Sequence, residues 1–487
     1  MKMGEDPGRT IMRGALANAL GFLLRFGGRL IFLFVAARLY GAHLYGAFVL
    51  AAALIELAVA VGGLATKKTL YPLLDRAAES GERPLGHVIL DAALLVTAVS
   101  LALALTIAAG ALLLAPPDIA AALVLIAPMV AGQALLDLAI AAARWRGKVR
   151  YDVVSRSLIE PWFLAAGAIA AFRLGLGEYG LAAGYWCGTI AALGYAFWGV
   201  VRNYEGFELA RYRLSRDGLR AIANGAAANS ASDFLNALYM RADLYLVGLL
   251  LGAAPTGIYG MARQVTTPVR QVRQSFDTLL VPAVARAIGR GGAAGATEAL
   301  ASAARLMLVI QLPLLIAMLA IGRPLMGWLG QGFEAGYWPL VILGGAEVLQ
   351  SALGIGDLIF VYLRPRIGLY LTLVSIVAGI VAALLLMPPF GITGAALALL
   401  TAYALRSVLR FAVLHWRFGV PVPHAHLAGP LLAAGAAAAA VRAVSDPALA
   451  LAAGLALYSA LLGLWLKLTG QRLALTGFTA EARPAAD

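Results

Sequence analysis

The chain has few charged residues and a single cysteine. Aspartate, glutamate, lysine and arginine make up 13% of the 487 residues, whereas hydrophobic residues make up 62%. The mean hydropathy of +0.84 is higher than a soluble domain of this length can sustain. Because Cys187 has no second cysteine to pair with, an internal disulfide and a multi-cysteine metal site are excluded. The composition predicts an all-α polytopic membrane protein, and we expect neither a metal site nor a cofactor.

Two further absences bear on function. The sequence contains no G-x-x-x-x-G-K-[ST] phosphate-binding loop of the kind found in ATP-driven pumps. It also lacks long connections between its apolar segments. The longest connection expected outside the membrane is residues 323–337, and the longest one expected in the cytoplasm is residues 202–220. Both are too short for a folded domain. We therefore expect the function to lie within the membrane, and we do not expect an enzyme.

About fourteen spanning helices are predicted from apolar runs of about 20 residues each. The runs lie near residues 14–37, 44–66, 86–114, 119–143, 153–172, 179–201, 222–251, 257–284, 302–322, 338–362, 367–387, 393–414, 427–444 and 448–468. With the N-terminus in the cytoplasm, 28 of the 38 lysines and arginines fall in cytoplasmic segments, among them Arg156, Arg305 and Arg410, and four fall in external ones. This positive-inside pattern predicts cytoplasmic termini. It also accounts for the net charge of +13 without a nucleic-acid partner.

Three weak matches between the two halves of the chain indicate an internal repeat. The matching segments begin at residues 41 and 252, 137 and 357, and 177 and 391, which gives offsets of 211, 220 and 214 residues. Such a repeat predicts two six-helix lobes related by an axis along the membrane normal. The predicted parts are residues 1–201 for the first lobe, 202–221 for a cytoplasmic linker, 222–417 for the second lobe, and 418–487 for an extra helix pair with a cytoplasmic tail.

One apolar stretch, residues 257–286, contains three arginines within its predicted span: Arg263, Arg270 and Arg273. An arginine at the centre of a spanning helix costs roughly 2.5 to 3.5 kcal/mol on insertion scales, so it normally faces a bundle interior or a water-filled path. At helical spacing, Arg263, Arg270 and Asp277 fall on one polar stripe, and Arg273 lies beside it. The stripe predicts a cavity that binds an anion.

Polar residues also line up on the predicted spans near 14–37 and 222–251. We predict three groups of cavity residues: the cations Arg25, Arg29, Arg263, Arg270 and Arg273; the neutral polar residues Asn18, Asn229, Asn236 and Gln264; and the candidate ion-coupling carboxylates Asp243, Asp137 and Asp277. An alternative is that the arginines pair with carboxylates on neighbouring helices. Two other carboxylates, Asp91 and Asp357, are expected near a membrane surface, where they would be solvated.

Two segments carry a resemblance to a known family. L-Y-G-A-x-x-Y-G-A-F at residues 39–48 and R-A-D-L-Y-L-V-G-L-L-L-G-A-A-P-T-G-I-Y-G-M-A at residues 241–262 resemble polysaccharide-biosynthesis flippases that carry O-antigen or exopolysaccharide repeat units. These belong to the multidrug/oligosaccharidyl-lipid/polysaccharide exporter superfamily. The resemblance implies two lobes around a central cavity and alternating access in the bacterial inner membrane. It also implies that Arg25, Arg29, Arg263 and Arg270 correspond to cavity arginines of the related lipid II flippases.

The expected function is to move an undecaprenyl-pyrophosphate-linked oligosaccharide from the cytoplasmic to the periplasmic leaflet. Its dianionic head cannot cross hydrocarbon unaided, whereas a cationic cleft supplies charge-assisted hydrogen bonds. Membrane lipids and polysaccharide polymerase or export components are the expected partners of a monomer. Three alternatives stay open: a lipid II flippase, a multidrug exporter with acidic and aromatic cavity walls, and a membrane-embedded O-antigen ligase or polymerase. The sugar, the pathway and the driving ion are also left open.

Overall fold

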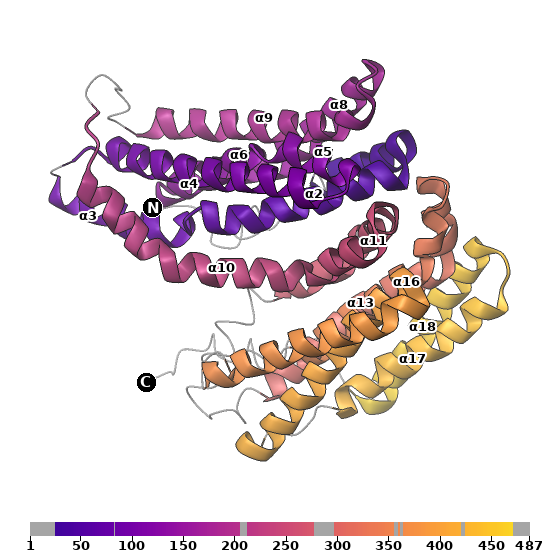
Figure 1. Cartoon of the computed structure of the whole chain (residues 1–487). Coiled ribbons are helices and arrows are strands. Elements are labelled where there is room, and N and C mark those ends of the chain that lie inside the picture. Colours follow the sequence, from indigo (N-terminus) through magenta and orange to yellow (C-terminus); the bar gives the residue numbers. More distant parts are fainter. Residues whose placement is uncertain are drawn as a thin grey trace, which may run out of the picture. The chain divides into compact units, whose positions relative to one another are not determined.

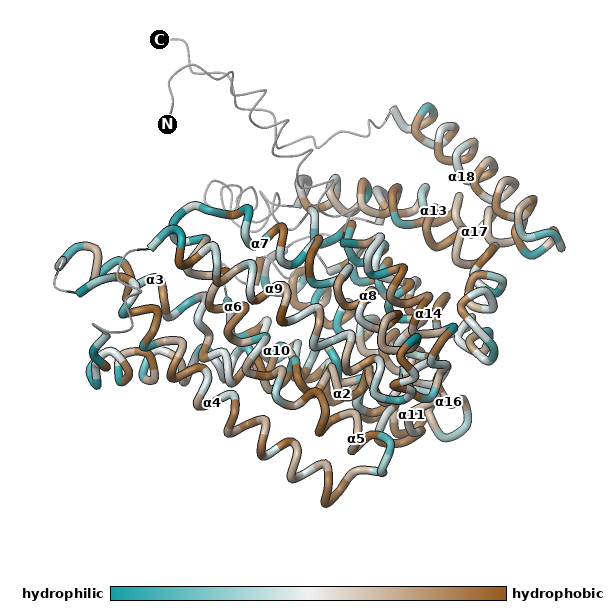
Figure 2. Tube along the Cα trace, turned by 90° about the horizontal axis from the view of Figure 1, so that it is seen from above, coloured by the Kyte–Doolittle hydropathy of each residue, from teal (hydrophilic) through white to brown (hydrophobic). Residues whose placement is uncertain are grey.

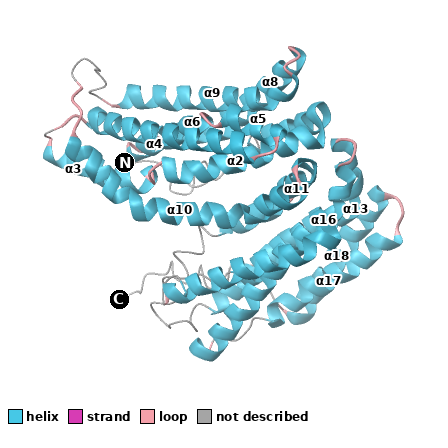
Figure 3. Ribbon diagram, viewed as in Figure 1, coloured by secondary structure: helices cyan, strands magenta, loops and turns pink. Residues whose placement is uncertain are grey.

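The computed structural model describes residues 25–81, 83–204, 212–276, 297–354, 359–360, 364–419 and 424–470. Throughout these ranges the regular structure is helical and no strand occurs (Figure 3). Eight of the described helical segments are long and apolar enough to cross a membrane, and the helix Leu427–Ala443 is a shorter apolar one. The prediction of an all-α polytopic membrane protein is therefore confirmed. The number of fourteen spans stays a prediction.

The chain divides into two compact units, residues 1–245 and 246–487. The elements of the first unit are η1 (Ala36–Tyr40), α2 (Gly41–Gly62), α3 (Thr66–Ser80), α4 (Leu85–Leu114), α5 (Pro117–Ile126), α6 (Met129–Trp145), α7 (Arg150–Val154), η2 (Ser155–Ile159), α8 (Glu160–Arg173), η3 (Gly177–Tyr179) and α9 (Gly180–Asn203). Most of α10 (Arg216–Leu251) also belongs to it. Helices α2, α4, α6 and α9 lie side by side in this unit (Figure 1).

The core of the first unit is built around α6. Leu136 and Ile140 on this helix are buried against Leu70 of α3, Ile89 of α4 and Val200 of α9. Away from this core, apolar side chains are exposed along α4, which is brown over much of its length in Figure 2. Exposed leucines on a spanning helix are suited to lipid contact. Since lipid chains are as apolar as leucine, close packing rather than burial from water holds such helices together.

Glycines bring α8 and α9 close together. Gly184 and Gly188, four residues apart on α9, are buried against α8. A β-carbon at Gly184 would lie 2.7 Å from the carbonyl oxygen of Leu164, and one at Gly188 would lie 2.7 Å from that of Glu160. This G-x-x-x-G arrangement lets the two backbones approach, as is common where membrane helices pack. It fixes the position of Glu160, which belongs to the site described below.

The second unit contains α11 (Ala253–Val265), a helical segment over residues 267–276, α13 (Thr297–Leu329), η5 (Phe333–Gly336), α14 (Tyr337–Gly354), α16 (Pro365–Phe418), α17 (His424–Ala443) and α18 (Pro447–Thr469). Helix α13 packs against α14, α17 and α18, and α17 packs against α18. The 54 residues of α16 form two helices that meet at a kink at Gly391, whose φ of 55° and ψ of −133° are not helical. A single helix of this length would exceed the roughly 30 Å hydrocarbon core by far.

Candidate functional site

Arg25 is held by a hydrogen-bonding partner on a neighbouring helical segment. Its Nε and Nη2 atoms donate to the hydroxyl of Ser157, at 3.2 and 3.0 Å. Ser157 is buried within η2, a π-helical turn that directly precedes α8. Pro161 explains this turn, because it lacks the N–H that would bond to the carbonyl of Ser157 in a regular helix. Arg29, one turn after Arg25, is exposed.

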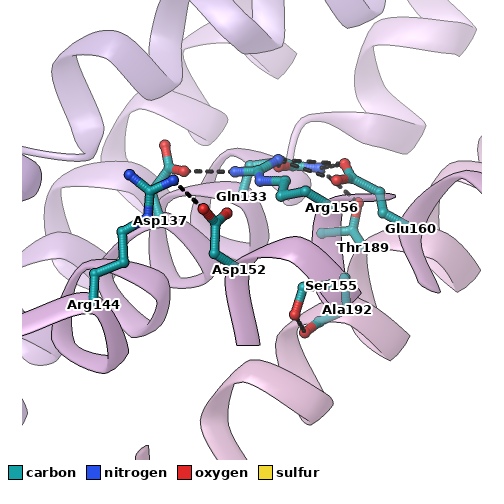
Figure 4. A network of polar contacts seen from close by, with 9 residues as sticks. All are labelled: Gln133, Asp137, Arg144, Asp152, Ser155, Arg156, Glu160, Thr189 and Ala192. Atoms are coloured by element: carbon teal, nitrogen blue, oxygen red, sulfur yellow. Dashed lines mark hydrogen bonds and ion pairs between the residues drawn. The ribbon is translucent and has the colours of Figure 1, made fainter. Parts of the chain in front are cut away.

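Arg156, next to Ser157, is the centre of a polar network between α6, η2, α8 and α9 (Figure 4). Its Nη2 donates to Asp137 at 2.5 Å, and its Nη1 donates to Glu160 Oε2 at 3.2 Å and to Gln133 Oε1 at 3.0 Å. The amide nitrogen of Gln133 donates in turn to Glu160 Oε1 and to the hydroxyl of Thr189, both at 3.0 Å. The network therefore joins one arginine to two carboxylates.

Arg156 is not among the site residues predicted from the sequence. Its position near the end of an apolar run predicted a cytoplasmic residue, but its side chain is only 25% exposed and is packed within the helices. Its spacing of four residues from Glu160 was the available signal, since residues at i and i+4 are neighbours on a helix. Asp137, one of the predicted ion-coupling residues, is paired with Arg156 in the structure.

In the second unit, Arg270 lies beside a buried carboxylate. Its Nη1 is 3.9 Å from Glu347 Oε1, and its Nη2 donates to the hydroxyl of Thr267 at 3.4 Å. The Glu347 side chain is 9% exposed, and that of Arg270 is 25% exposed. Both distances are long for charge-assisted contacts, which are about 2.7 to 2.9 Å when well formed. Arg270 thus has an acidic group within 4 Å of its guanidinium.

Around this pair the second unit buries further polar groups. Gln311, on α13, is fully buried and donates from Nε2 to the carbonyl of Val269 and to the hydroxyl of Ser351, both at 2.8 Å. The Nε atom of Arg273, one turn after Arg270, is buried and makes no hydrogen bond within the described part of the chain. A buried donor without a partner is costly. Arg263 and Gln264 are partly buried near the end of α11.

The predicted polar residues of α10 have varied surroundings. Asn229 donates from its side chain to the carbonyl of Gly225 at 2.9 Å, Asn236 is exposed, and Asp243 is half-buried. Arg241 is ion-paired with Glu56 of α2. The remaining predicted residues, Asn18 and Asp277, lie outside the described residues, as does Asp357.

Asp91 corrects an expectation from the sequence. It is 1% exposed rather than solvated, and it pairs with Arg83. Its Oδ1 also accepts a hydrogen bond from the hydroxyl of Tyr212 at 2.6 Å. Burial, together with this contact, raises the pKa of Tyr212 to about 12. The carboxylate therefore ties the segment before α10 to the start of α4.

Two arginines counted as cytoplasmic are also buried. Arg305 is 4% exposed, and Arg410 is completely inaccessible. The Nη1 atom of Arg410 donates at 2.7 Å to the carbonyl of Leu353, in the last turn of α14. A cation there satisfies one of the carbonyls that a helix leaves unpaired at its C-terminus. Arg410 thus has a structural role, which the charge count alone did not indicate.

Chemically, the described site residues can bind an anion and exchange ion-pair partners. Guanidinium groups present planar donors that match phosphate and carboxylate oxygens, and arginine stays charged in proteins. Among the described residues, no group of three or more His, Cys, Asp or Glu side chains is placed to hold a metal ion.

Comparisons with known proteins place these features in a family. The family model described as "Polysaccharide biosynthesis protein" matches residues 11–288. A curated relative, the probable low-salt glycan biosynthesis flippase Agl15 of Haloferax volcanii, is 23% identical over 192 residues, which are 39% of this chain. The match spans only 41% of that relative's length.

Two solved structures have a similar fold. The lipid II flippase MurJ in an inward closed conformation matches with a TM-score of 0.75 and 12% identity, covering 93% of this chain and 100% of that one. An inward-facing multidrug resistance MATE family transporter of the MOP superfamily matches with a TM-score of 0.65 and 13% identity, covering 80% of this chain and 94% of that one. At these identities the likeness concerns the fold alone. Since the family model covers more than half of the sequence, the predicted relationship is confirmed, and the chain belongs to the polysaccharide biosynthesis protein family.

Proposed function

We propose that this protein is a flippase that moves an undecaprenyl-pyrophosphate-linked oligosaccharide from the cytoplasmic to the periplasmic leaflet of a bacterial inner membrane. Membership of the family supports a role in polysaccharide biosynthesis. The name of the Agl15 relative, a probable low-salt glycan biosynthesis flippase, supports a glycan as the cargo. The fold shared with transporters supports alternating access as the mechanism.

The observation that carries the proposal is the pair Arg270 and Arg273. They lie one turn apart on the helical segment 267–276, so their side chains are neighbours. Arg273 keeps a buried donor without a hydrogen bond in the described structure, and the contact of Arg270 with Glu347 is long. A diphosphate between them would supply the missing acceptor and several charge-assisted bonds. Two guanidinium groups also balance the charge of a dianionic head.

Glu347 gives the site a way to release its cargo. When the diphosphate binds, Arg270 exchanges its 3.9 Å contact with Glu347 for shorter bonds to phosphate oxygens. When the diphosphate leaves, the carboxylate again neutralises the arginine. If Glu347 were absent, release of the diphosphate would leave the charge of Arg270 without this carboxylate to neutralise it, which is costly. Arg270 would then hold the diphosphate more tightly. In this proposal Arg25, Arg29 and Arg263 are further cavity cations, which stays a prediction.

The direct test is to replace Arg270 and measure glycan transport in inverted membrane vesicles. We expect Arg270→Ala to abolish transport while the protein still inserts in the membrane. Arg270→Lys should retain part of the activity, since lysine keeps the charge but loses the two-pronged donor geometry. The matched control is Arg323→Ala, which removes an exposed arginine in the same unit and should transport normally. Wild-type transport by the Arg270→Ala protein would contradict the proposal.

A second candidate is a lipid II flippase of peptidoglycan synthesis. It is favoured by the fold, since the lipid II flippase MurJ matches over 93% of this chain with a TM-score of 0.75. The two candidates differ in the sugar attached to the same diphosphate lipid. Complementation separates them: rescue of a strain depleted of its lipid II flippase would support the second, and rescue of an O-antigen flippase mutant would support the first.

A further inference from the structure

An apolar groove in the first unit lies between α10, α4 and the link from α2 to α3. It has a volume of about 620 Å³. Val61 and Leu64 line it at the end of α2, Leu95 and Val99 line it on α4, and the face of α10 that contains Ala227 completes it. Of the described lining residues, only Ser230 is polar. The groove is therefore suited to hydrocarbon and offers almost nothing to a polar ligand.

Polar contacts hold α10 beside the bundle. Toward its C-terminal end, the hydroxyl of Tyr245 donates to the carbonyl of Ala53 at 2.8 Å. Near its middle, Asp233 accepts from Lys68 of α3 at 2.7 Å. Along the groove, Ala223, Ala227 and Ala231 stay exposed, because small side chains on α10 leave space in front of α4. The helix is thus fixed in place while its apolar face is left uncovered by the first unit.

The backbone at the link from α2 to α3 adopts an uncommon conformation. Leu64 and Ala65 have φ angles of 50° and 47°, in the left-handed region that favours glycine. Strain of this kind costs on the order of 1 kcal/mol or more per residue and tends to persist at functional sites. Here it turns the chain sharply from α2 into α3 and places Leu64 at the groove.

We propose that this groove binds the polyprenyl chain of the lipid-linked cargo, an inference that rests on the proposed function. The lining residues lie within helices that are long and apolar enough to span the membrane, or just beyond the ends of those helices. The medium around the groove is therefore hydrocarbon. An apolar cavity does not hold water, and a hydrocarbon chain is the molecule at hand to fill it. The chain would otherwise have to stay wholly in lipid while its head occupies a polar site.

Charge at the end of the groove favours a diphosphate lipid over a neutral one. Arg220 is exposed on α10, three residues before Ala223 and seven before Ala227, so it lies on the same helix face. Lys68 of α3, half-exposed and paired with Asp233, is a second cation nearby. Both belong to the region that the sequence predicts on the cytoplasmic side, where the cargo is loaded. Because Asp233 already pairs with Lys68, Arg220 contributes the attraction, which favours a diphosphate head over an uncharged one.

The test uses the wild-type full-length protein in phosphatidylcholine nanodiscs. One probe is a polyprenyl diphosphate with a diazirine at the end of its chain, and the other is phosphatidylglycerol with a diazirine at the end of an acyl chain. After irradiation, labelled residues are identified by mass spectrometry. We expect the prenyl probe to label residues 223–235 of α10 and residues 95–99 of α4, and an excess of unlabelled polyprenyl diphosphate to reduce this labelling about tenfold.

A pair of matched variants completes the test. Ala227→Trp fills the groove and should reduce labelling by the prenyl probe about tenfold. Ser232→Trp enlarges another small, exposed side chain of α10 that does not line the groove, and it should label within about twofold of wild type. Unchanged labelling of Ala227→Trp would overturn the inference. So would labelling by phosphatidylglycerol that polyprenyl diphosphate does not displace.

Vesicle transport is measured in parallel, so that the two proposals can fail separately. If the wild-type protein transports glycan but the groove is not labelled, only the proposal that the groove binds the polyprenyl chain is contradicted. Absence of glycan transport by the wild-type protein contradicts the proposed function.

Discussion

Arg25 and Ser157 are joined across the first unit by two hydrogen bonds from one guanidinium group, at 3.2 and 3.0 Å. Because Ser157 is buried next to Arg156, this contact links a predicted cavity cation to the network of Asp137 and Glu160. The position of Arg25 therefore depends on a helix that the sequence analysis did not connect with it. It follows that a change at the serine acts on the arginine.

The first prediction concerns this link. Replacing Ser157 with alanine removes the acceptor and should weaken binding of polyprenyl diphosphate about twofold to tenfold, since a hydrogen bond contributes roughly 0.5 to 1.5 kcal/mol. Binding is measured with purified protein in nanodiscs. Ser155→Ala is the control, because the Ser155 hydroxyl is buried but donates to the carbonyl of Ala192 instead. Equal affinities for wild type and Ser157→Ala would show that Arg25 does not need this partner.

The second prediction concerns the charge network. Replacing Arg156 with methionine leaves Asp137 and Glu160 without their shared cation and should destabilise the protein by roughly 2 to 4 kcal/mol, less than a fully buried pair because these groups are about a fifth exposed. Thermal unfolding in detergent measures the effect. Arg144→Met is the control: this arginine pairs with Asp152, is half exposed, and should cost about 1 kcal/mol or less. Equal unfolding temperatures for the two variants would show that the Arg156 network stabilises the protein no more than the exposed ion pair of Arg144 does.

The third prediction concerns the contact between α8 and α9. A methyl group at Gly188 would meet the carbonyl of Glu160 and the side chain of Leu164, so Gly188→Ala should destabilise the fold by roughly 1 to 3 kcal/mol. Gly194→Ala, on the same helix with nothing within 4 Å, should be neutral or stabilising by up to about 1 kcal/mol. Unfolding in detergent checks both. A neutral Gly188→Ala variant would show that the helices separate easily.

The sequence was sufficient to predict the helical class and the family but not the partners of the charged residues within the helices. Hydropathy reports the medium around each segment, so spans and their apolar faces follow from it directly. It does not report partners: Arg156, Arg305 and Arg410 were counted as cytoplasmic because charge near the end of an apolar run normally lies outside the membrane. The contacts of Arg156 and Arg410 involve groups that are distant in sequence, such as Asp137 and Leu353. Long-range pairing of this kind leaves no periodic pattern in one sequence.

The last prediction concerns energy coupling. The proposed transport cycle needs a source of free energy, for which an ion gradient, the membrane potential and the flow of cargo are the candidates. Intramembrane carboxylates are the usual sites for a coupling ion. Of the two predicted coupling residues that are described, Asp137 is held by Arg156 at 2.5 Å, which favours a structural role. Asp243 is half-buried on α10, two residues after Arg241, and it stays the first candidate.

Asp243→Asn keeps the size of the side chain and removes the charge that an ion or proton would neutralise. In vesicles with an imposed proton or sodium gradient, we expect wild-type transport to rise with one of the gradients and transport by this variant to lose that response. Asp217→Asn is the matched control, because it makes the same change on the same helix at an exposed residue in the first turn. It should respond to the gradient as wild type does. If the Asp243→Asn protein also keeps the full response, Asp243 is not the coupling residue, and its role is to neutralise a neighbouring cation.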